Sequence, residues 1–255
     1  MSKRCHASIR IIIVIGAVCA LPTVSFAQVR VIISGGFSAA YRELLPEFER
    51  TSGTTVITTT GGSQGDGPNT IRAQLRRGVL ADIVIMNRAG LNELIADGRI
   101  VAGTDIDLAH TYLGMAVRAG APKPDISTVD AFKQTLLRAK SIAFDSSTTG
   151  IYLTATLLPR LGIADEMARK STTSGVAAVA RGDAEIAVQP VSEILAVRGV
   201  DLVGKIPAEV QYTAVFSAAV VAGSKEAEAS KRLIAFLASD GAIAAMKKNG
   251  MEPSR

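Results

Sequence analysis

The apolar positions along the chain alternate between two spacings, and most strand-like runs are followed by a helix-like run. Residues 29–34 form a short β-branched apolar run of the kind that fits a buried strand. Apolar residues from Tyr41 to Phe48 then recur on one helical face, which predicts a helix over 38–53 that ends at a glycine. Further strands are expected at 54–60, 81–86, 112–120, 141–145, 184–190 and 210–223, and further helices at 69–78, 89–100, 128–140, 151–163, 174–183, 226–239 and 241–250. This alternation predicts an α/β protein with a mainly parallel sheet.

Two interruptions divide the alternation into two halves of the same kind. A segment with two prolines occupies 121–128, and the long β-rich run at 210–223 follows the last strand and helix of the second half. Both are natural places for the chain to cross between lobes. We therefore expect lobe 1 to comprise 28–115 and 211–255, and lobe 2 to comprise 116–210.

The first 27 residues have the three parts of a secretory signal peptide. Basic residues precede the apolar run at 11–24, and small residues at positions 25 and 27 fit cleavage after Ala27. The alternative, an uncleaved membrane anchor, is disfavoured because the apolar run is short for spanning a bilayer. Segment 1–27 is thus predicted to direct export to the periplasm and to be removed.

Removal of this segment changes what the composition implies. Both cysteines, Cys5 and Cys19, would be lost, so the mature chain could form no disulfide and no thiolate metal site. Three of the 28 basic residues also leave, and 25 against 23 acidic residues lowers the formal charge from +5 to +2. This balance implies no nucleic-acid partner. The remaining histidine, His110, argues against an ordinary zinc site, and we expect neither a metal nor a cofactor.

Three turns of small and hydroxyl residues stand where a predicted strand meets a predicted helix: SGGFS, GGSQG and, in the second lobe, SSTTG. The first N–H groups of a helix have no partner within it, and glycines leave them open to an anion. Tight packing explains the glycines of any single turn equally well, but three such turns in two lobes favour an anion site. The candidate ligand contacts in these turns are Ser34, Gly35, Gly36, Phe37, Ser38, Ser63, Gln64, Ser146, Ser147, Thr148, Thr149 and Gly150.

Three residues outside the turns are further candidates. Arg72 is close enough to GGSQG to meet a ligand carboxylate, although a solvated helix face is its ordinary explanation. Gln189 is polar at the end of a predicted strand, where ligands gather in open α/β sheets. Tyr152, at the start of a helix, fits the core and the cleft equally well. No residue is identified as a catalytic base.

These segments resemble the extracellular solute-binding proteins related to the periplasmic molybdate-binding proteins of ABC importers. The more specific pieces are QLRRGVLADIVI at 74–85 and AVARGDAEIAV at 178–188, and the resemblance covers nearly all of the mature chain. It implies a type II periplasmic binding protein, in which two α/β lobes close over the ligand by a hinge. It also implies a small anionic ligand and the membrane component of an ABC importer as partners, and we expect the protein to be a monomer.

Departures from the molybdate binders suggest a different anion. Gly36 stands where the resemblance places an oxyanion-contacting serine, and Gln189 stands where it places a tyrosine. Fewer bulky side chains imply room for a di- or tricarboxylate rather than molybdate.

A branch of the family with SGGF turns and a connection such as RAGAPKPDIS, at 118–127, is also similar. This branch includes periplasmic aconitate isomerase. Two hypotheses therefore stand: a binding protein that delivers an anion to an importer, or an isomerase that interconverts cis- and trans-aconitate by an allylic proton shift in the same cleft. The binding function is favoured because binding proteins outnumber enzymes on this fold, although fold alone does not determine function.

Overall fold

The structure, a computed structural model, describes residues 27–254. The predicted signal peptide, with Cys5 and Cys19, therefore lies outside the described residues except for Ala27. Within the described part, no helix combines the length and the apolar character needed to cross a membrane.

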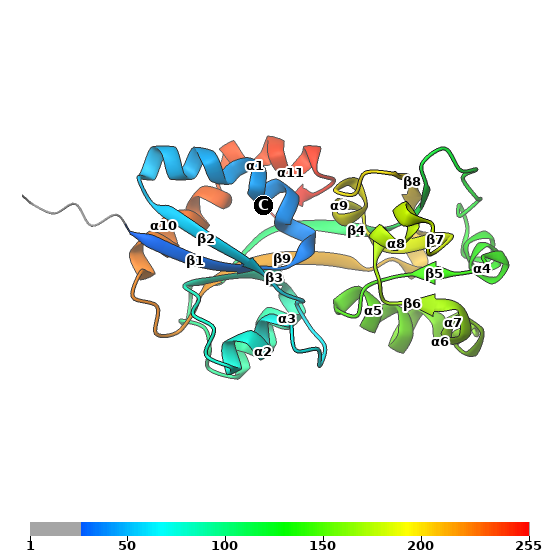
Figure 1. The fold of residues 1–255 in the computed structure, drawn as a ribbon, viewed down its shortest axis with the longest axis horizontal. Coiled ribbons are helices and arrows are strands. Elements are labelled where there is room, and N and C mark those ends of the chain that lie inside the picture. The colour runs from blue at the N-terminus through cyan, green and yellow to red at the C-terminus, as the bar shows by residue number, and fades with distance from the viewer. Residues whose placement is uncertain (1–26, 255) are drawn as a thin grey trace, which may run out of the picture.

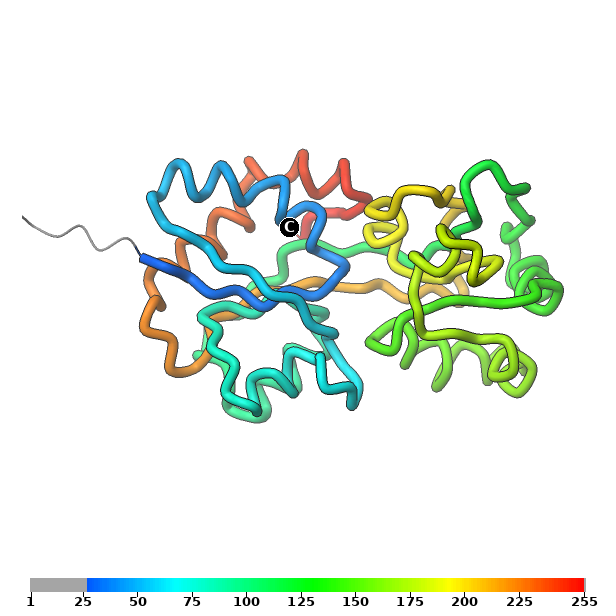
Figure 2. The backbone as a smooth tube through the Cα atoms, in the orientation of Figure 1, coloured from blue at the N-terminus to red at the C-terminus, as the bar shows by residue number. Residues whose placement is uncertain are grey.

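Two lobes lie side by side, and two strands run between them (Figure 1; Figure 2). The first half of β4 (Ile106–Arg118) pairs with β9 (Thr213–Val220), and its second half pairs with β7 (Ile186–Pro190) and β8 (Val200–Lys205). One sheet thus continues through both lobes, in the order β2-β1-β3-β9-β4-β7-β5-β6.

Helices cover both faces of this sheet. The remaining elements of the first lobe are β1 (Gln28–Ile33), α1 (Gly35–Ser52), β2 (Thr55–Thr60), α2 (Ile71–Arg76), β3 (Ile83–Asn87), α3 (Arg88–Ala96), α10 (Ala227–Leu237), α11 (Ile243–Lys248) and β10 (Glu252–Pro253). Those of the second lobe are α4 (Val129–Arg138), β5 (Ile142–Ala143), α5 (Thr148–Tyr152), α6 (Leu158–Arg160), α7 (Ala164–Lys170), β6 (Ser171–Thr172), α8 (Val176–Arg181) and α9 (Val191–Leu195), with a π-helical turn (Leu153–Leu157) that joins α5 to α6. Single 3-10 turns lie at Ala208–Val210 and Asp240–Ala242.

The prediction of a mainly parallel sheet was wrong for the centre of the molecule. The pairs β1–β2, β1–β3, β5–β6 and β5–β7 are parallel, as expected for strands followed by helices. However, β9 runs antiparallel to β3 and β4, and β4 runs antiparallel to β7 and β8. The reason is topological, because a chain that leaves a lobe through β4 and returns toward β9 must travel in opposite directions.

Alternate strand residues pack on opposite faces of the sheet, which gives each lobe two apolar layers. In the first lobe, Val31 and Ile33 of β1 pack under α1, α10 and α11, while Ile32 faces α2 and α3. The change of lobe along β4 falls between Ala109, in the core of the first lobe, and Leu113, in the core of the second. The predicted boundary after residue 115 lies inside the second-lobe part of β4.

Several element boundaries follow the predicted signals. Helix α1 ends at Gly53, which adopts the left-handed conformation at φ 66° that glycine tolerates best. The predicted helix at 151–163 instead begins at Thr148 and contains the π-helical turn. Strand β8 was not predicted, because none of the residues of VDLVGK is fully buried and no turn signal isolates them.

Gly36, in the first turn of α1, packs against the ring of Phe216. A Cβ atom at Gly36 would lie 1.9 Å from Phe216 Cζ, well inside van der Waals contact. We expect Gly36→Ala to lower the free energy of unfolding by about 1–3 kcal/mol, as in other overpacked cores. Urea unfolding measures this change. Gly67→Ala, where a Cβ meets nothing within 4 Å, is the control. Unchanged stability of Gly36→Ala would show that the ring moves aside freely.

Candidate functional site

A cavity of about 250 Å³ lies between the two lobes. It is formed where strands β1, β3 and β7 end and where helices α1, α3, α5 and α9 begin. Its lining residues are Ser34, Gly35, Gly62, Ser63, Asn87, Asp145, Ser146, Ser147, Thr148, Thr149, Pro190, Glu193, Ala214 and Phe216. The carboxyl ends of strands and the N-termini of helices are the usual place for ligands in α/β folds.

On the first-lobe side, Ser34 connects β1 to α1. Its backbone N–H donates to Ile85 O at 2.8 Å, which fixes the end of β1 against β3. Its hydroxyl is buried, makes no hydrogen bond and does not cap α1. The first turn of α1 also contains no acidic residue, so the positive end of this 18-residue helix has no compensating side chain within the helix.

Ser63 and Asn87 extend the same wall. Asn87 N donates to Ser63 Oγ at 2.9 Å, and Asn87 Oδ1 caps α3 by accepting from Ala89 N at 3.0 Å. A Cβ at Gly90 would lie 2.1 Å from Ser63 O, so glycine is required for α3 to approach this loop. Tyr212 OH, from the segment before β9, also donates to Asn87 Oδ1 at 3.3 Å.

On the second-lobe side, Asp145 organises the turn before α5. One carboxyl oxygen accepts from Ser147 N at 2.8 Å and from Gly150 N at 3.3 Å. The Gln189 amide donates to the other oxygen at 3.2 Å and accepts from Asp145 N at 2.8 Å. Burial raises the pKa of Asp145, and these hydrogen bonds oppose that shift. Gln189 therefore holds the turn in place through Asp145.

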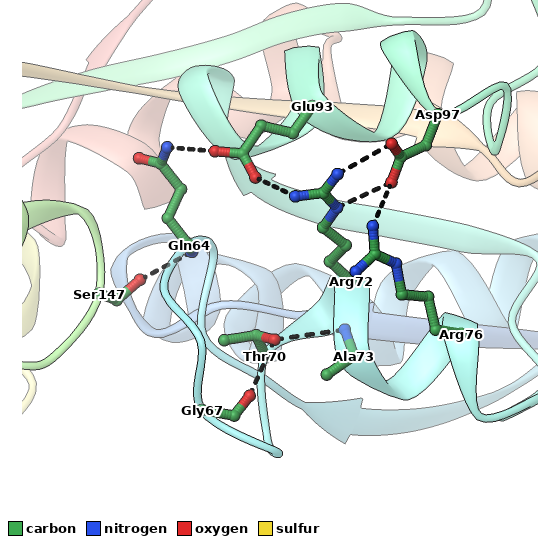
Figure 3. Close-up of polar contacts among 9 residues, drawn as sticks. All are labelled: Gln64, Gly67, Thr70, Arg72, Ala73, Arg76, Glu93, Asp97 and Ser147. Atoms are coloured by element: carbon green, nitrogen blue, oxygen red, sulfur yellow. Dashed lines mark hydrogen bonds and ion pairs between the residues drawn. The ribbon is translucent and has the colours of Figure 1, made fainter.

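The two walls touch at the edge of the cavity. Gln64 N, in the first lobe, donates to Ser147 Oγ, in the second lobe, at 3.1 Å (Figure 3). The hydroxyl of Thr148, next in the chain, is buried and has no hydrogen-bond partner. Together with Ser34, this places an unpaired hydroxyl on each side of the cavity. Unpaired buried hydroxyls are costly, and a ligand that accepts hydrogen bonds removes that cost.

Glu193, in the first turn of α9, lines the cavity. The position of a Cβ at Gly35 is 3.1 Å from Glu193 Oε1, so this second-lobe carboxyl lies against the start of α1. Burial raises the pKa of Glu193 from 4.5 to about 8, and the nearby Asp145 adds to that shift. No hydrogen bond from another described residue reaches the Glu193 carboxyl.

The described residues that line the cavity include two carboxyls but no lysine, arginine or histidine. An anion here would be held by hydroxyls, an amide and backbone N–H groups. Groups of three or more possible metal-ligating side chains are also absent from residues 27–254.

The structure brings about half of the predicted contacts to the cavity. The predicted residues that line it are Ser34, Gly35, Ser63, Ser146, Ser147, Thr148 and Thr149. The predicted residues that do not line it are Gly36, Phe37, Ser38, Gln64, Arg72, Gly150, Tyr152 and Gln189.

Arg72 lies away from the cavity, with its guanidinium directed at α3. It makes two hydrogen bonds to Asp97, at 2.7 and 2.8 Å, and a third contact to Glu93 at 3.4 Å (Figure 3). Gln64 Nε2 donates to the other oxygen of Glu93 at 2.7 Å. Arg72 thus joins α2 to α3 instead of facing a ligand.

The other predicted residues outside the lining have structural partners. Phe37 is buried in the first-lobe core, and Ser38 Oγ donates to Ser34 O at 2.9 Å. A Cβ at Gly150 would lie 2.0 Å from Asp145 O, so the close packing of this turn requires glycine. Tyr152 donates to Val210 O at 2.9 Å and stacks on Tyr212 near the crossing segment.

Sequence reasoning missed Asn87, Asp145 and Glu193. Asn87 and Glu193 lie at or just after a strand-to-helix transition, as the first three turns do, in IVIMN and in QPVSE. Asp145 directly precedes SSTTG. Extending the search for polar residues to every strand end, rather than to glycine-rich ones, could have found all three.

Comparisons with known proteins agree with this architecture. The family model described as bacterial extracellular solute-binding protein matches residues 29–252. An aconitate isomerase from Pseudomonas sp. is 39% identical over 227 residues, which cover 88% of this chain and 87% of that protein.

Solved structures show the same fold at lower identity. The periplasmic molybdate-binding protein of Azotobacter vinelandii has a TM-score of 0.69 at 19% identity, covering 88% of this chain and 98% of that one. The sulfate-binding protein SubI of Mycobacterium tuberculosis has a TM-score of 0.67 at 17% identity, and the match covers 89% of this chain and 87% of that one. The predicted type II periplasmic binding protein fold is confirmed.

The raised pKa of Glu193 makes the stability of the empty protein depend on pH. The unfolded chain releases this proton near pH 4.5, whereas the folded protein keeps it to about pH 8. The folded state therefore binds more protons in this window, and the free energy of unfolding falls as the pH rises. We expect Glu193→Gln to reduce this fall, as measured by urea unfolding at pH 5 and pH 8.5.

Glu47→Gln, on the exposed face of α1, is the matched control and should follow the wild type. If Glu193→Gln and the wild type lose stability in parallel between these pH values, the Glu193 carboxyl titrates in its ordinary range.

Proposed function

Because the chain belongs to the bacterial extracellular solute-binding proteins, we propose that it binds a small organic polycarboxylate between its lobes and isomerises it, with cis- and trans-aconitate as the substrate pair. The protein acts after export to the periplasm through the predicted signal peptide. The isomerase reading, the second of the two sequence hypotheses, takes precedence because of the chemistry of the cavity.

The observation that carries this proposal is a cavity with hydrogen-bond donors on its walls and a free carboxyl inside. Buried hydroxyls at Ser34 and Thr148 suit a ligand that accepts hydrogen bonds. An anion that is bound without reacting needs such donors alone and has no use for a proton acceptor. A substrate with an acidic C–H bond needs an acceptor for its proton as well, and Glu193 supplies one.

The size of the cavity and the sequence relationship support the same substrate class. The cavity volume of about 250 Å³ is just below the range of sites for drug-sized ligands, roughly 300–1,000 Å³, which suits a small organic acid. The aconitate isomerase of Pseudomonas sp. matches along nearly the whole mature chain. At that identity and coverage, a related reaction is a stronger inference than one drawn from fold likeness alone.

Delivery of the anion to an ABC importer is the second candidate function. The family match favours it, because members of this family are described as solute-binding proteins. The two functions share one site and predict different behaviour of the ligand after binding.

The deciding experiment incubates purified mature protein with cis-aconitate, and separately with trans-aconitate, and follows both isomers by proton NMR. An isomerase brings both samples to the same mixture. Calorimetric binding of aconitate without conversion would indicate a carrier. Tighter binding of molybdate or sulfate than of any carboxylate would contradict the proposed ligand class.

The unpaired hydroxyls give a second test. Ser34→Ala and Thr148→Val each remove one donor to an ionised group, a loss of about 1.5–3 kcal/mol, which corresponds to roughly 10- to 100-fold weaker binding. The melting temperature of the empty protein should hardly change, because neither hydroxyl has a protein partner.

Arg72→Ala is the control for these variants. It breaks the contacts to Asp97 and Glu93, so it should lower the melting temperature while changing the dissociation constant less than twofold. A large loss of affinity in Arg72→Ala, with normal binding by Ser34→Ala and Thr148→Val, would place the ligand elsewhere.

A further inference from the structure

Glu193 occupies a special position among the carboxyls of the protein. It belongs to the second lobe, yet its Oε1 lies 3.1 Å from the Cβ position of Gly35 in the first lobe. A Cβ at Gly35 would make a tight contact with this oxygen, so the glycine leaves room for the carboxyl in its present position. Glu193 therefore lies inside the cavity, between the donors of α1 and the hydroxyl-rich turn before α5.

The geometry points to Glu193 as the catalytic base that moves the substrate proton, an inference that rests on the isomerase function proposed above. Glu193 lines the cavity and its carboxyl receives no hydrogen bond from another described residue, so no protein donor occupies the oxygens that a substrate C–H group would need.

Asp145, the other carboxyl of the cavity, is unsuited to this role. One of its oxygens accepts from Ser147 N and Gly150 N, and the other accepts from the Gln189 amide. Both oxygens are therefore occupied by protein donors, and moving the carboxyl toward a substrate carbon would disrupt the turn. Asp145 is instead a positioning residue for the Ser147–Thr149 hydroxyls.

The proton shift balances without any further reagent. The carboxylate of Glu193 takes a proton from the methylene carbon, and the electron pair of that C–H bond becomes the new carbon–carbon double bond. The former double bond shifts its electrons to its far carbon, which receives the proton back from Glu193. One C–H bond breaks and one forms, nothing is oxidised or reduced, and the new double bond forms in the other geometry.

The electrostatic surroundings suit a base that must also give its proton back. Burial and the charge of Asp145 raise the pKa of Glu193 to about 8. Helix α9 packs against α1, β4, β7 and β8. Among residues 27–254, Asp145 is the one charged group that raises the pKa of Glu193. The open N-terminus of α1 beside it favours the carboxylate form. A base that titrates near neutral pH transfers a proton efficiently in both directions.

The decisive variant is Glu193→Gln, compared with Glu47→Gln on the exposed face of α1. Removing a general base costs about 10²- to 10⁴-fold in rate, so the turnover number should fall by that amount. The dissociation constant for trans-aconitate should change less than tenfold, toward tighter binding, because a negative charge leaves the site. Glu47→Gln should match the wild type in both measurements.

Proton exchange gives a readout that a purely structural role would not produce. In D₂O, wild-type protein should exchange the methylene protons of trans-aconitate, and Glu193→Gln should abolish this exchange while still binding. If Glu193→Gln does not fold, Glu193→Asp takes its place. It should slow turnover while keeping a kcat/KM that falls as the pH falls, because an aspartate at this position must also lose its proton before it can act as the base.

The assignment of Glu193 as the base and the isomerase function can fail separately. If the wild type isomerises aconitate and Glu193→Gln does so within threefold of it, the assignment of the base is overturned and the isomerase function stands. If the wild type neither isomerises aconitate nor exchanges its methylene protons, the proposed function fails and the assignment fails with it.

Discussion

Buried backbone N–H groups and hydroxyls need acceptors, and this requirement governs how the two lobes face each other. Strands β1, β3 and β7 end at the same cavity, and a helix follows each of them at once. Groups that a helix cannot pair internally therefore collect between the lobes. Ser34 and Thr148 add hydroxyls that no protein atom satisfies. In the function proposed above, the ligand supplies the missing acceptors, which couples lobe closure to binding.

The carboxyls in the cavity give this common arrangement a different chemical character. A site made of neutral dipoles binds an anion through the electrostatic field of those dipoles. A carboxylate beside the ligand weakens that binding. The protein nevertheless places Glu193 there and fixes Asp145 through three hydrogen-bonding groups. Such an arrangement weakens anion binding and places a proton acceptor in the cavity, which the isomerase function proposed above requires.

The fold could be predicted largely from local patterns. Alternating apolar spacing located most strands and helices, and glycines such as Gly53 marked where they ended. The sheet order could not be predicted, because the pairing of β4 with β9 joins residues about one hundred positions apart. About half of the candidate site could also be predicted from local patterns, because Ser34, Ser63 and Thr148 lie in turns that the sequence shows. Arg72 was misleading, because its partner Glu93 lies on α3 and its partner Asp97 directly follows that helix.

The sequence by itself determined the two α/β lobes, because hydrophobic periodicity and turn residues act over a few neighbouring positions. It also determined that hydroxyls and glycines stand at the strand ends. Only the tertiary structure decided which of these residues share a cavity, and that Glu193 of one lobe meets Gly35 of the other. It also decided that Gly36 serves packing against Phe216. The physical reason is that burial, and with it the pKa of a carboxyl, depends on everything that surrounds the group in space, whatever its distance along the chain.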